Sequence, residues 1–258
     1  MRILFIADIV GTPGRKAVEE RLPSLLEELE VDFCVANGEN VADGVGITPK
    51  LADRLLAAGI DAITLGNHVW RRIEIVPYLT GSDRVVRPAN LGSAAPGKGL
   101  AVVSARNGTR VAVINVMGSL FMNVPVSLWE IVDELVAEAR REAQVVFVDV
   151  HAEATSEKVA LSQWLDGEVT AVVGTHTHVQ TNDARIQPGG TAAITDAGMT
   201  GPHDSVIGVE ADLAIRRMRT HLPIRFQPAE GDVRLEGVVI DCSDDGVAHG
   251  IELVRVPA

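Results

Sequence analysis

Two histidines separated by a single residue stand out in this chain, which has only 7 histidines among 258 residues. His176 and His178 lie in the stretch TAVVGTHTHVQTND, directly after the apolar run Ala171–Val173 and a glycine. Imidazole nitrogens are ligands that divalent transition metals accept. The pair therefore indicates a metal site at the end of a buried strand.

Four other apolar runs end in residues of the same chemical kind. Asp8 follows Ile3–Ala7, Glu39 and Asn40 come after Phe33–Ala36, Asn67 and His68 follow Ile63–Gly66, and His151 follows Val145–Val150. Ligands of open α/β folds collect at the carboxyl ends of the strands. We therefore expect these carboxylates, carboxamides and imidazoles to lie at one edge of a sheet.

Each of these residues, taken alone, has a simpler explanation. Asp8 is compatible with a loop cap, His151 with a hydrogen-bonded structural histidine, and Glu39 with an acidic turn. The histidine pair is harder to explain in this way. Alternate side chains of an extended segment point in the same direction, so both rings would reach one site. Five such strand ends together favour a functional site over five coincidences.

The number of donors predicts two metal ions, because a tetrahedral zinc accepts only four ligands. Two divalent ions that share a carboxylate and a bridging hydroxide would leave the pocket positive, since Asp8, Glu39 and the hydroxide cancel only part of their charge. The chain as a whole has a formal net charge of −12. Such a surface repels a nucleic-acid polymer, whereas a small phosphate ester can bind in the positive pocket.

The order of the elements predicts an α/β fold. Strands alternate with helices that we expect over residues 14–30, 48–59, 127–143 and 156–165, the first bent or divided by Pro23. Thr48 is a predicted N-cap, and Ser127 with Glu130 is a predicted capping box. Residues 232–242 and 246–257 alternate like a β-hairpin. These late strands favour two mixed sheets packed face to face with helices outside, in one domain over residues 1–258.

No segment of the chain predicts contact with a membrane. The first apolar run, Ile3–Ala7, is far shorter than the roughly 20 residues of a spanning helix and lacks the features of a signal peptide. Cys34 and Cys242 lie in apolar runs and are expected to be reduced core residues. We expect a cytoplasmic protein, and the sequence leaves open whether it forms a homo-oligomer.

The order of the motifs resembles that of the calcineurin-like metallophosphoesterases. LGNHVW is similar to their Gly-Asn-His segment and GTHTH to their Gly-His-x-His segment, with Thr175 where the family has glycine. ADIVGTPGR and ANGEN occupy the places of the Asp-x-His and Gly-Asp segments, but Val10 replaces the histidine and Glu39 the aspartate. These departures, together with RPAN, TDAGMTGP and SVIG, are typical of the YmdB-type subfamily, which the chain resembles over residues 1–256.

This resemblance implies a metallophosphoesterase-like αββα sandwich and phosphodiesterase activity on 2',3'-cyclic nucleotides. It also implies two divalent ions, with iron or manganese favoured over zinc or magnesium. The implied roles of the residues are as follows: Asp8 and His178 hold the first ion, Glu39 bridges both ions, Asn40 lies near the first ion or the phosphate, Asn67, His151 and His176 hold the second ion, and Asn90 lines the substrate. Because Val10 cannot coordinate, the first ion is expected to be held more weakly.

The expected reaction is hydrolysis of a phosphodiester by a hydroxide that bridges the two ions. His68 follows Asn67, so in an extended stretch its side chain points away from that of Asn67. We expect His68 to contact the substrate and to act as general acid on the leaving oxygen, with a turn-capping role as the alternative. Asp196 and His203, in the glycine-rich loop 195–205, are expected either to orient the ligand imidazoles or only to pack.

Two other functions remain compatible with these motifs. The first is a phosphomonoesterase or nucleotidase, because the motifs define the metals and not the far wall of the pocket. The second is a regulatory protein with slow phosphoesterase turnover. An amidohydrolase is disfavoured, since its His-x-His pair lies on the first strand of an eight-stranded barrel and here the pair follows residue 170.

Overall fold

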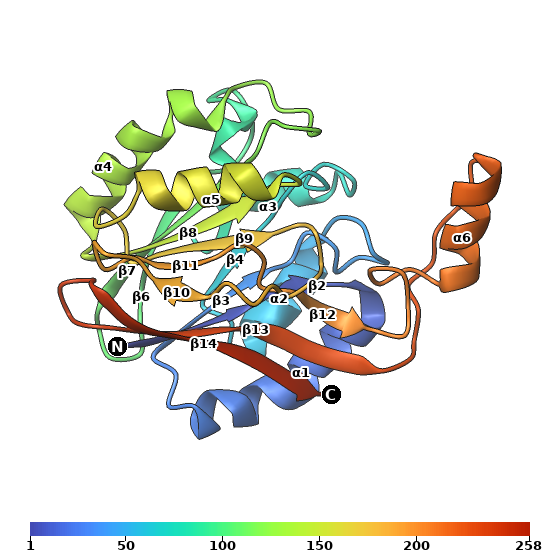
Figure 1. The fold of residues 1–258 in the computed structure, drawn as a ribbon, viewed down its shortest axis with the longest axis horizontal. Coiled ribbons are helices and arrows are strands. Elements are labelled where there is room, and N and C mark those ends of the chain that lie inside the picture. Colours follow the sequence, from blue (N-terminus) through green and yellow to red (C-terminus); the bar gives the residue numbers. More distant parts are fainter.

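The computed structural model describes all 258 residues, and its strands form two mixed β-sheets (Figure 1). The strands of the larger sheet are β1 (Arg2–Ile6), β2 (Asp8–Ile9), β3 (Phe33–Asn37), β4 (Ala62–Thr64), β5 (Val85–Val86), β12 (Met199–Pro202), β13 (Val233–Cys242) and β14 (Ala248–Pro257). Their order is β2-β12-β13-β1-β3-β4-β5, with β14 paired to β13. β1, β3, β4 and β5 run parallel, whereas β13 is antiparallel to both β1 and β14.

The smaller sheet has six strands. They are β6 (Leu100–Ser104), β7 (Arg110–Met117), β8 (Val145–His151), β9 (Ala171–Thr175), β10 (Arg185–Ile186) and β11 (Ala192–Ile194). The order is β10-β11-β9-β8-β7-β6, and β7, β8, β9 and β11 are parallel. Parallel strands place their carboxyl ends at one edge, so β8 and β9 end next to each other.

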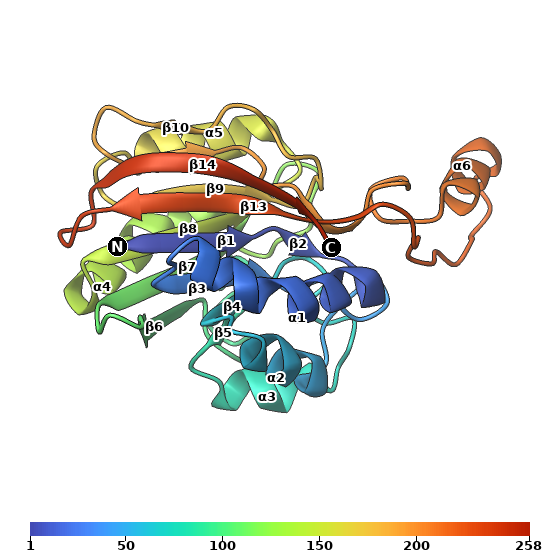
Figure 2. The ribbon, with the colours of Figure 1, turned by 90° about the horizontal axis from the view of Figure 1, so that it is seen from below.

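Helices cover the outer faces of both sheets. The helices are α1 (Gly11–Glu28), α2 (Pro49–Ala57), α3 (Ile75–Gly81), α4 (Val132–Glu142), α5 (Thr155–Trp164) and α6 (Ala211–Thr220), with short 3-10 turns at Ala89–Leu91 and Leu128–Glu130. Figure 1 shows α4 and α5 on one side of the sheets and α1 on the other. α6 stands away from the rest of the chain there and in the turned view of Figure 2. No helix combines the length and the apolar character that crossing a bilayer requires.

The core is layered because side chains of a strand alternate between its two faces. Ile3 and Phe5 of β1 point into the layer between the sheets, whereas Leu4 and Ile6 point toward the helices α1–α3. Phe5 stacks on Phe147 of β8 with ring centroids 5.3 Å apart, which joins the two sheets directly. The predicted αββα sandwich is therefore confirmed, as are the hairpin β13–β14 and the Thr48 cap, whose hydroxyl accepts a hydrogen bond from the backbone N–H of Leu51.

The helix predicted over residues 127–143 is wrong at its start. Leu128–Glu130 is a 3-10 turn, α4 begins only at Val132, and the side chain of Ser127 makes no capping hydrogen bond. Leu128 and Val132 are both buried against the smaller sheet. Burial of such side chains contributes about 1.5–3 kcal/mol each, which outweighs a cap worth ~1 kcal/mol.

Two further segments differ from the prediction. α1 begins at Gly11 and continues through Pro23 without division. The glycine-rich segment 195–205 is not all loop, since Met199–Pro202 forms β12 and pairs with both β2 and β13. α1 lies very close to this strand, because a Cβ atom on Gly14 of α1 would overlap the carbonyl oxygen of Thr200, and a Cβ atom on Gly201 of the strand would lie 3.2 Å from Cβ of Val10. Pairing on both sides thus overrides the low strand propensity of glycine.

Candidate metal centre

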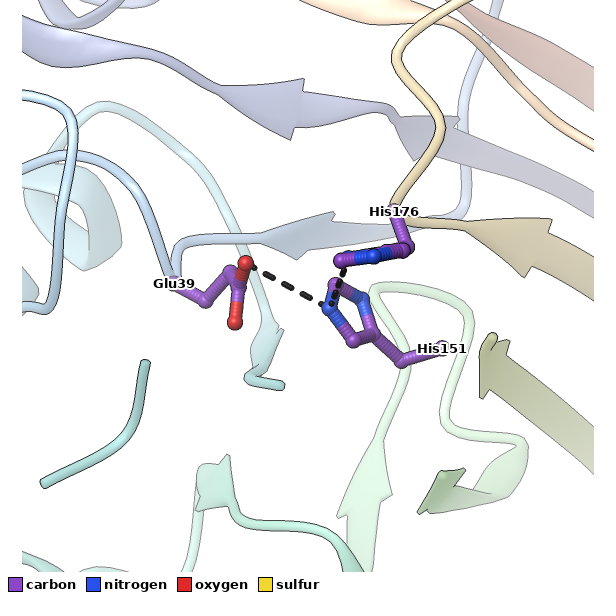
Figure 3. A group of neighbouring side chains, drawn as sticks. All are labelled: Glu39, His151 and His176. Carbon is purple, nitrogen blue, oxygen red and sulfur yellow. Dashed lines mark hydrogen bonds and ion pairs between the residues drawn. The ribbon is translucent and has the colours of Figure 1, made fainter. Parts of the chain in front are cut away.

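Side chains from both sheets converge where β3, β4, β8 and β9 end. Glu39 follows β3, His151 ends β8 and His176 follows β9. Figure 3 shows the carboxylate of Glu39 facing the two imidazoles, which lie against each other. One ligand atom from each of the three residues lies within 4.8 Å of the others. This is the spacing of a group that can hold a metal ion.

Glu39 is fully buried but only half of its carboxylate is hydrogen-bonded. Oε2 accepts a hydrogen bond of 2.9 Å from the backbone N–H of His68. Oε1 lies 3.1 Å from Nδ1 of His68 and 3.3 Å from Nε2 of His151, yet neither contact has hydrogen-bond geometry. Burial opposes the charge of Glu39, but the positive charges of His151 and His68 lower its pKa well below the usual range.

His151 is anchored from within the smaller sheet. Its Nδ1 lies 2.9 Å from Oγ1 of Thr175, and that hydroxyl donates to Oδ1 of Asp149 at 2.6 Å. The hydroxyl therefore accepts from Nδ1–H, which leaves Nε2 facing Asn67 Oδ1 at 2.9 Å and His176 Nδ1 at 3.1 Å. Burial favours the neutral ring, but the charge of Glu39 and those of nearby aspartates raise the pKa of His151 to about 9. A metal ion would have to displace this proton.

Asp149 is a supporting residue that sequence reasoning missed. It is buried in β8 and accepts hydrogen bonds from Asn37 Nδ2 at 3.0 Å and Thr64 Oγ1 at 2.5 Å, in addition to the one from Thr175. Burial raises the pKa of its carboxyl group. The signal in the sequence is the spacing of two from His151, because alternate residues of a strand share a face.

The histidine pair reaches the site, but not for the predicted reason. β9 ends at Thr175, and His176 and His178 have φ values of +95° and +62°, so the segment is not extended. His176 turns toward His151 and places Nε2 3.0 Å from Oε2 of Glu153. Burial and then the charge of His151 lower the pKa of His176 to about 3, which keeps this ring neutral and able to bind a metal.

His178 faces a different set of residues. Its Nδ1 donates to the carbonyl oxygen of Ile207 at 3.0 Å, which leaves Nε2 3.2 Å from Asn40 Nδ2 and 3.7 Å from Asp8 Oδ1. Asp8 Oδ2 accepts from the backbone N–H of His176 at 3.2 Å. Burial raises the pKa of Asp8 to about 6, despite the attraction of His178 and His151.

The residue between the two histidines is held by a buried ion pair. Oδ2 of Asp196 accepts from the backbone N–H of Thr177 at 3.1 Å, from its hydroxyl at 2.6 Å and from Nζ of Lys158 at 3.0 Å. Lys158 and Asp196 are 3% and 1% exposed. Positive φ values of non-glycine residues cost of order 1–3 kcal/mol each, so the segment needs such restraint. Asp196 therefore orients the backbone and touches no ligand imidazole.

The structure brings His68 into the cluster and leaves two other candidates outside. Residues 67–70 form a turn, in which His68 Nδ1 lies 2.7 Å from Asn40 Oδ1 while Asn67 points to His151. His203 contacts the carbonyl oxygen of Met199 and no ligand imidazole. Asn90 is 0% exposed, and its amide bonds the backbone of Met117 and Val126, so it does not line the cluster.

The residues of this cluster fit a divalent metal ion. Asp8 Oδ1 and Glu39 Oε1 are buried and have no hydrogen-bond partner, although buried polar atoms are nearly always satisfied. Gly66 leaves the space between them and the rings, because a Cβ atom there would overlap Glu39 Oε2 and His151 Nε2. Carboxylate oxygens and imidazole nitrogens are the donors that such ions accept.

Comparisons with known proteins find relatives that match nearly the whole chain. A 2',3'-cyclic-nucleotide 2'-phosphodiesterase of Bacillus subtilis is 48% identical over 99% of this chain and 96% of its own length. A crystal structure of a Thermus thermophilus protein has a TM-score of 0.93 at 40% identity, covering 100% of this chain and 99% of that one. The crystal structure of a phosphatase of Mycoplasma pneumoniae has a TM-score of 0.92 at 31% identity, covering 100% and 93%. The sequence model described as "YmdB-like protein" matches residues 4–254, and the chain therefore belongs to the YmdB-like family.

Proposed function

We propose that this protein is a metal-dependent phosphodiesterase that hydrolyses 2',3'-cyclic nucleotides and uses two divalent ions, iron or manganese. The observation that carries the proposal is the pair of unpartnered, buried carboxylate oxygens of Asp8 and Glu39, which face imidazoles from the opposite sheet. The activity named for the 48% identical Bacillus relative supports the choice of substrate.

The residues would divide into two ligand sets that share Glu39. Asp8, His178 and Asn40 form one set, and the other consists of Asn67, His151 and His176. Bound divalent ions supply Lewis-acid stabilisation of the phosphoryl oxygens and a water of lowered pKa. Val10 is buried and contributes no donor, so the set that contains Asp8 is expected to bind its ion more weakly.

His68 would act on the leaving oxygen. Its Nδ1 is held by Asn40 Oδ1, whereas Nε2 has no partner within the protein, and its side chain is 24% exposed. A substrate can therefore approach Nε2 while Asn40 fixes the plane of the ring. In its protonated form the ring would donate the Nε2 proton to the leaving oxygen and keep the Nδ1 proton on Asn40, and such general-acid help contributes about 10²–10⁴ in rate. The turn geometry also explains why His68 and Asn67, although adjacent, have different neighbours.

The test is a substrate panel with the protein loaded with manganese or iron. We expect about two ions per chain by elemental analysis, and we expect turnover of 2',3'-cyclic nucleotides above that of linear diesters and monoesters. Loss of turnover on chelation and recovery on adding the ion back would support the proposal. A protein that binds no metal, or that hydrolyses both linear diesters and monoesters faster than 2',3'-cyclic nucleotides, would contradict it.

Phosphomonoesterase activity is the second candidate. The Mycoplasma pneumoniae relative of known structure is called a phosphatase, and it covers the whole of this chain. The same panel separates the two candidates, because a monoesterase hydrolyses nucleoside 3'-monophosphates faster than the cyclic esters. A regulatory protein would instead bind both ions and show turnover far below the roughly 1 s⁻¹ at the low end of typical enzymes.

A further inference from the structure

A cavity lies between α1, α2 and the segments that follow Asn40 and His68. It has a volume of about 410 Å³, and it is open to solvent. Its wall includes the first turn of α1, the chain after Asn40, the start of α2 and the turn after His68. We call it the arginine cavity, after Arg15, Arg71 and Arg72 in its wall.

The wall of the arginine cavity is formed by residues that neighbour those of the metal centre in the chain. Val41 and Ala42 in its wall follow Asn40 in the chain, and the backbone N–H of Gly11, next to Thr12 in the wall, donates to the carbonyl oxygen of Asn40 at 2.9 Å. The backbone N–H of Arg71 donates to the carbonyl oxygen of His68 at 2.9 Å. These contacts place the wall of the cavity next to the backbone of Asn40 and His68, so a second group of a ligand held at those two residues would lie near the arginines.

The cations of the cavity are only partly neutralised. Arg15 is 9% exposed, and only its Nη1 has an acidic partner, Glu19 at 2.7 Å. Arg72 Nη2 contacts the carbonyl oxygen of Ala42 at 3.1 Å and Asp43 at 3.2 Å, but its buried Nε has no partner. Arg71 makes no ion pair with any acidic group.

The cavity is positive although the chain is strongly acidic. Its wall holds Arg15, Arg71 and Arg72 against the carboxylates of Asp43 and Glu74. Glu19, which pairs with Arg15, is also paired with Arg54, so four arginines stand against three carboxylates, while the whole chain has a formal net charge of −12. The N-terminal turns of α1 and α2 also face it, through Thr12 and Thr48. Helix N-termini favour anions, so the backbone adds to the effect of the side chains.

We propose that the arginine cavity binds a second phosphate group of the substrate, one that is not hydrolysed. This rests on the proposed phosphodiesterase function and narrows its substrate class to nucleotides that carry a 5'-phosphate as well as the 2',3'-cyclic ester. Guanidinium groups suit phosphate because they offer several donors in a planar fork. Arg71, which makes no ion pair, and Nη1 of Arg72, which has no partner, are the donors left for it.

The experiment compares two substrates that differ only in the second phosphate. They are adenosine 2',3'-cyclic phosphate and its 5'-phosphorylated form, assayed with the manganese-loaded enzyme. We expect the wild type to have a lower KM for the 5'-phosphorylated substrate. A charge-assisted hydrogen bond is worth about 1.5–3 kcal/mol, so Arg71→Ala and Arg72→Ala should each raise that KM about 10-fold or more. The KM for the other substrate should not change.

Arg141→Ala is the matched control, because Arg141 is an exposed arginine of α4 that makes no ion pair. It should leave both KM values at the wild-type level. Equal KM values for the two substrates in the wild type would overturn the proposal. A KM for the 5'-phosphorylated substrate that stays as low in Arg71→Ala and in Arg72→Ala as in the wild type would also overturn it.

A binding measurement tests the phosphate site in the arginine cavity independently of the phosphodiesterase function. Calorimetric titration of the metal-free chain should detect adenosine 5'-monophosphate and not adenosine, with weaker binding to Arg71→Ala. This result in a protein that hydrolyses neither substrate would refute the phosphodiesterase function but retain the phosphate site. Inorganic phosphate that binds as tightly as the nucleotide would identify a free-anion site and overturn the assignment to the substrate.

Discussion

The two sheets contribute chemically different halves to the metal centre. The larger sheet presents carboxylates and carboxamides, including Asp8 in β2 and Glu39 after β3. The smaller sheet presents imidazoles, namely those of His151, His176 and His178 at and after the ends of β8 and β9. The unpartnered carboxylate oxygens of Asp8 and Glu39 and the imidazoles that face them come from different sheets, so this cluster exists only because the sheets pack face to face.

The halves also differ in how they are supported. Each imidazole has a partner that fixes its second nitrogen: Thr175 for His151, Glu153 for His176 and the carbonyl oxygen of Ile207 for His178. The carboxylates instead keep one buried oxygen each without a partner. The imidazole half is thus preorganised, whereas in the carboxylate half the buried Asp8 carries an electrostatic cost that a bound cation would relieve.

The largest effect is expected from removing a ring of the preorganised half. His176→Ala deletes a predicted ligand, so metal content and turnover should fall together. We expect activity to fall by about 10³-fold or more, because loss of a supporting partner alone typically reduces metal affinity or activity 10–100-fold. Elemental analysis and steady-state kinetics measure both quantities. His249→Ala, at an exposed position in β14, is the control. A metal-loaded, active H176A protein would remove His176 from the ligand set.

His68 lies at the carboxylate half, and its removal should separate metal binding from turnover. His68→Ala should retain both ions, since His68 belongs to neither proposed ligand set and its ring contacts none of the three ligand imidazoles. Turnover should fall by about 10²–10⁴-fold through loss of the proton donor. Loss of one ion in this variant would instead show that His68 is a ligand.

The electrostatic cost of the carboxylate half can be measured in the metal-free protein. Burial raises the pKa of Asp8 from 3.8 to about 6, so its contribution to stability is fully present below pH 3.8 and is lost as the pH rises through about 6. The free energy of unfolding of the wild type should therefore fall by up to about 3 kcal/mol over this pH range. Asp8→Asn cannot ionise, and its advantage in free energy of unfolding should grow by that amount between pH 4 and pH 7.5.

Metal binding should reverse the order of stability of the wild type and the Asp8→Asn variant. Manganese should stabilise the wild type by binding the carboxylate and should stabilise the Asp8→Asn variant much less. Denaturant unfolding at several pH values, with and without the ion, gives both comparisons. A difference in free energy of unfolding between the wild type and Asp8→Asn that does not vary with pH would show that burial of the charged Asp8 carboxylate has no electrostatic cost.

The sequence predicts the sandwich and the ends of its strands because these depend on local patterns. β1, β3, β8 and β9 are short apolar runs, and a polar donor directly after a run is visible without tertiary information. The late hairpin β13–β14 is also visible through its alternation, although it extends the larger sheet next to β1 and does not form the second sheet. Predictions therefore succeed where the physical cause lies within a few residues.

Features that depend on distant partners escape prediction. His176 and His178 have positive φ values. Their segment is held in this conformation by Asp196, which lies outside the motif, and Asp196 in turn pairs with Lys158 of α5. The break before α4 follows from burial of Leu128 in a core that only the folded sheet provides. The arginine cavity likewise unites Arg15 with a turn far along the chain.

The smallest effect is expected from the support of the imidazole half. Thr175 lies between His151 Nδ1 and Asp149, so Thr175→Val keeps the shape of the side chain but removes the hydroxyl group that orients the ring. Metal affinity should fall 10–100-fold, as is typical when such a partner is lost, while the fold and the ligand count are retained. Thr175→Ser restores the hydroxyl and should recover most of the affinity, which a purely steric role would not predict. Equal manganese affinity in the wild type and Thr175→Val, measured by competition with a chelator, would mean that packing alone holds His151. Packing against the sheet, and not hydrogen bonding, would then orient the imidazoles.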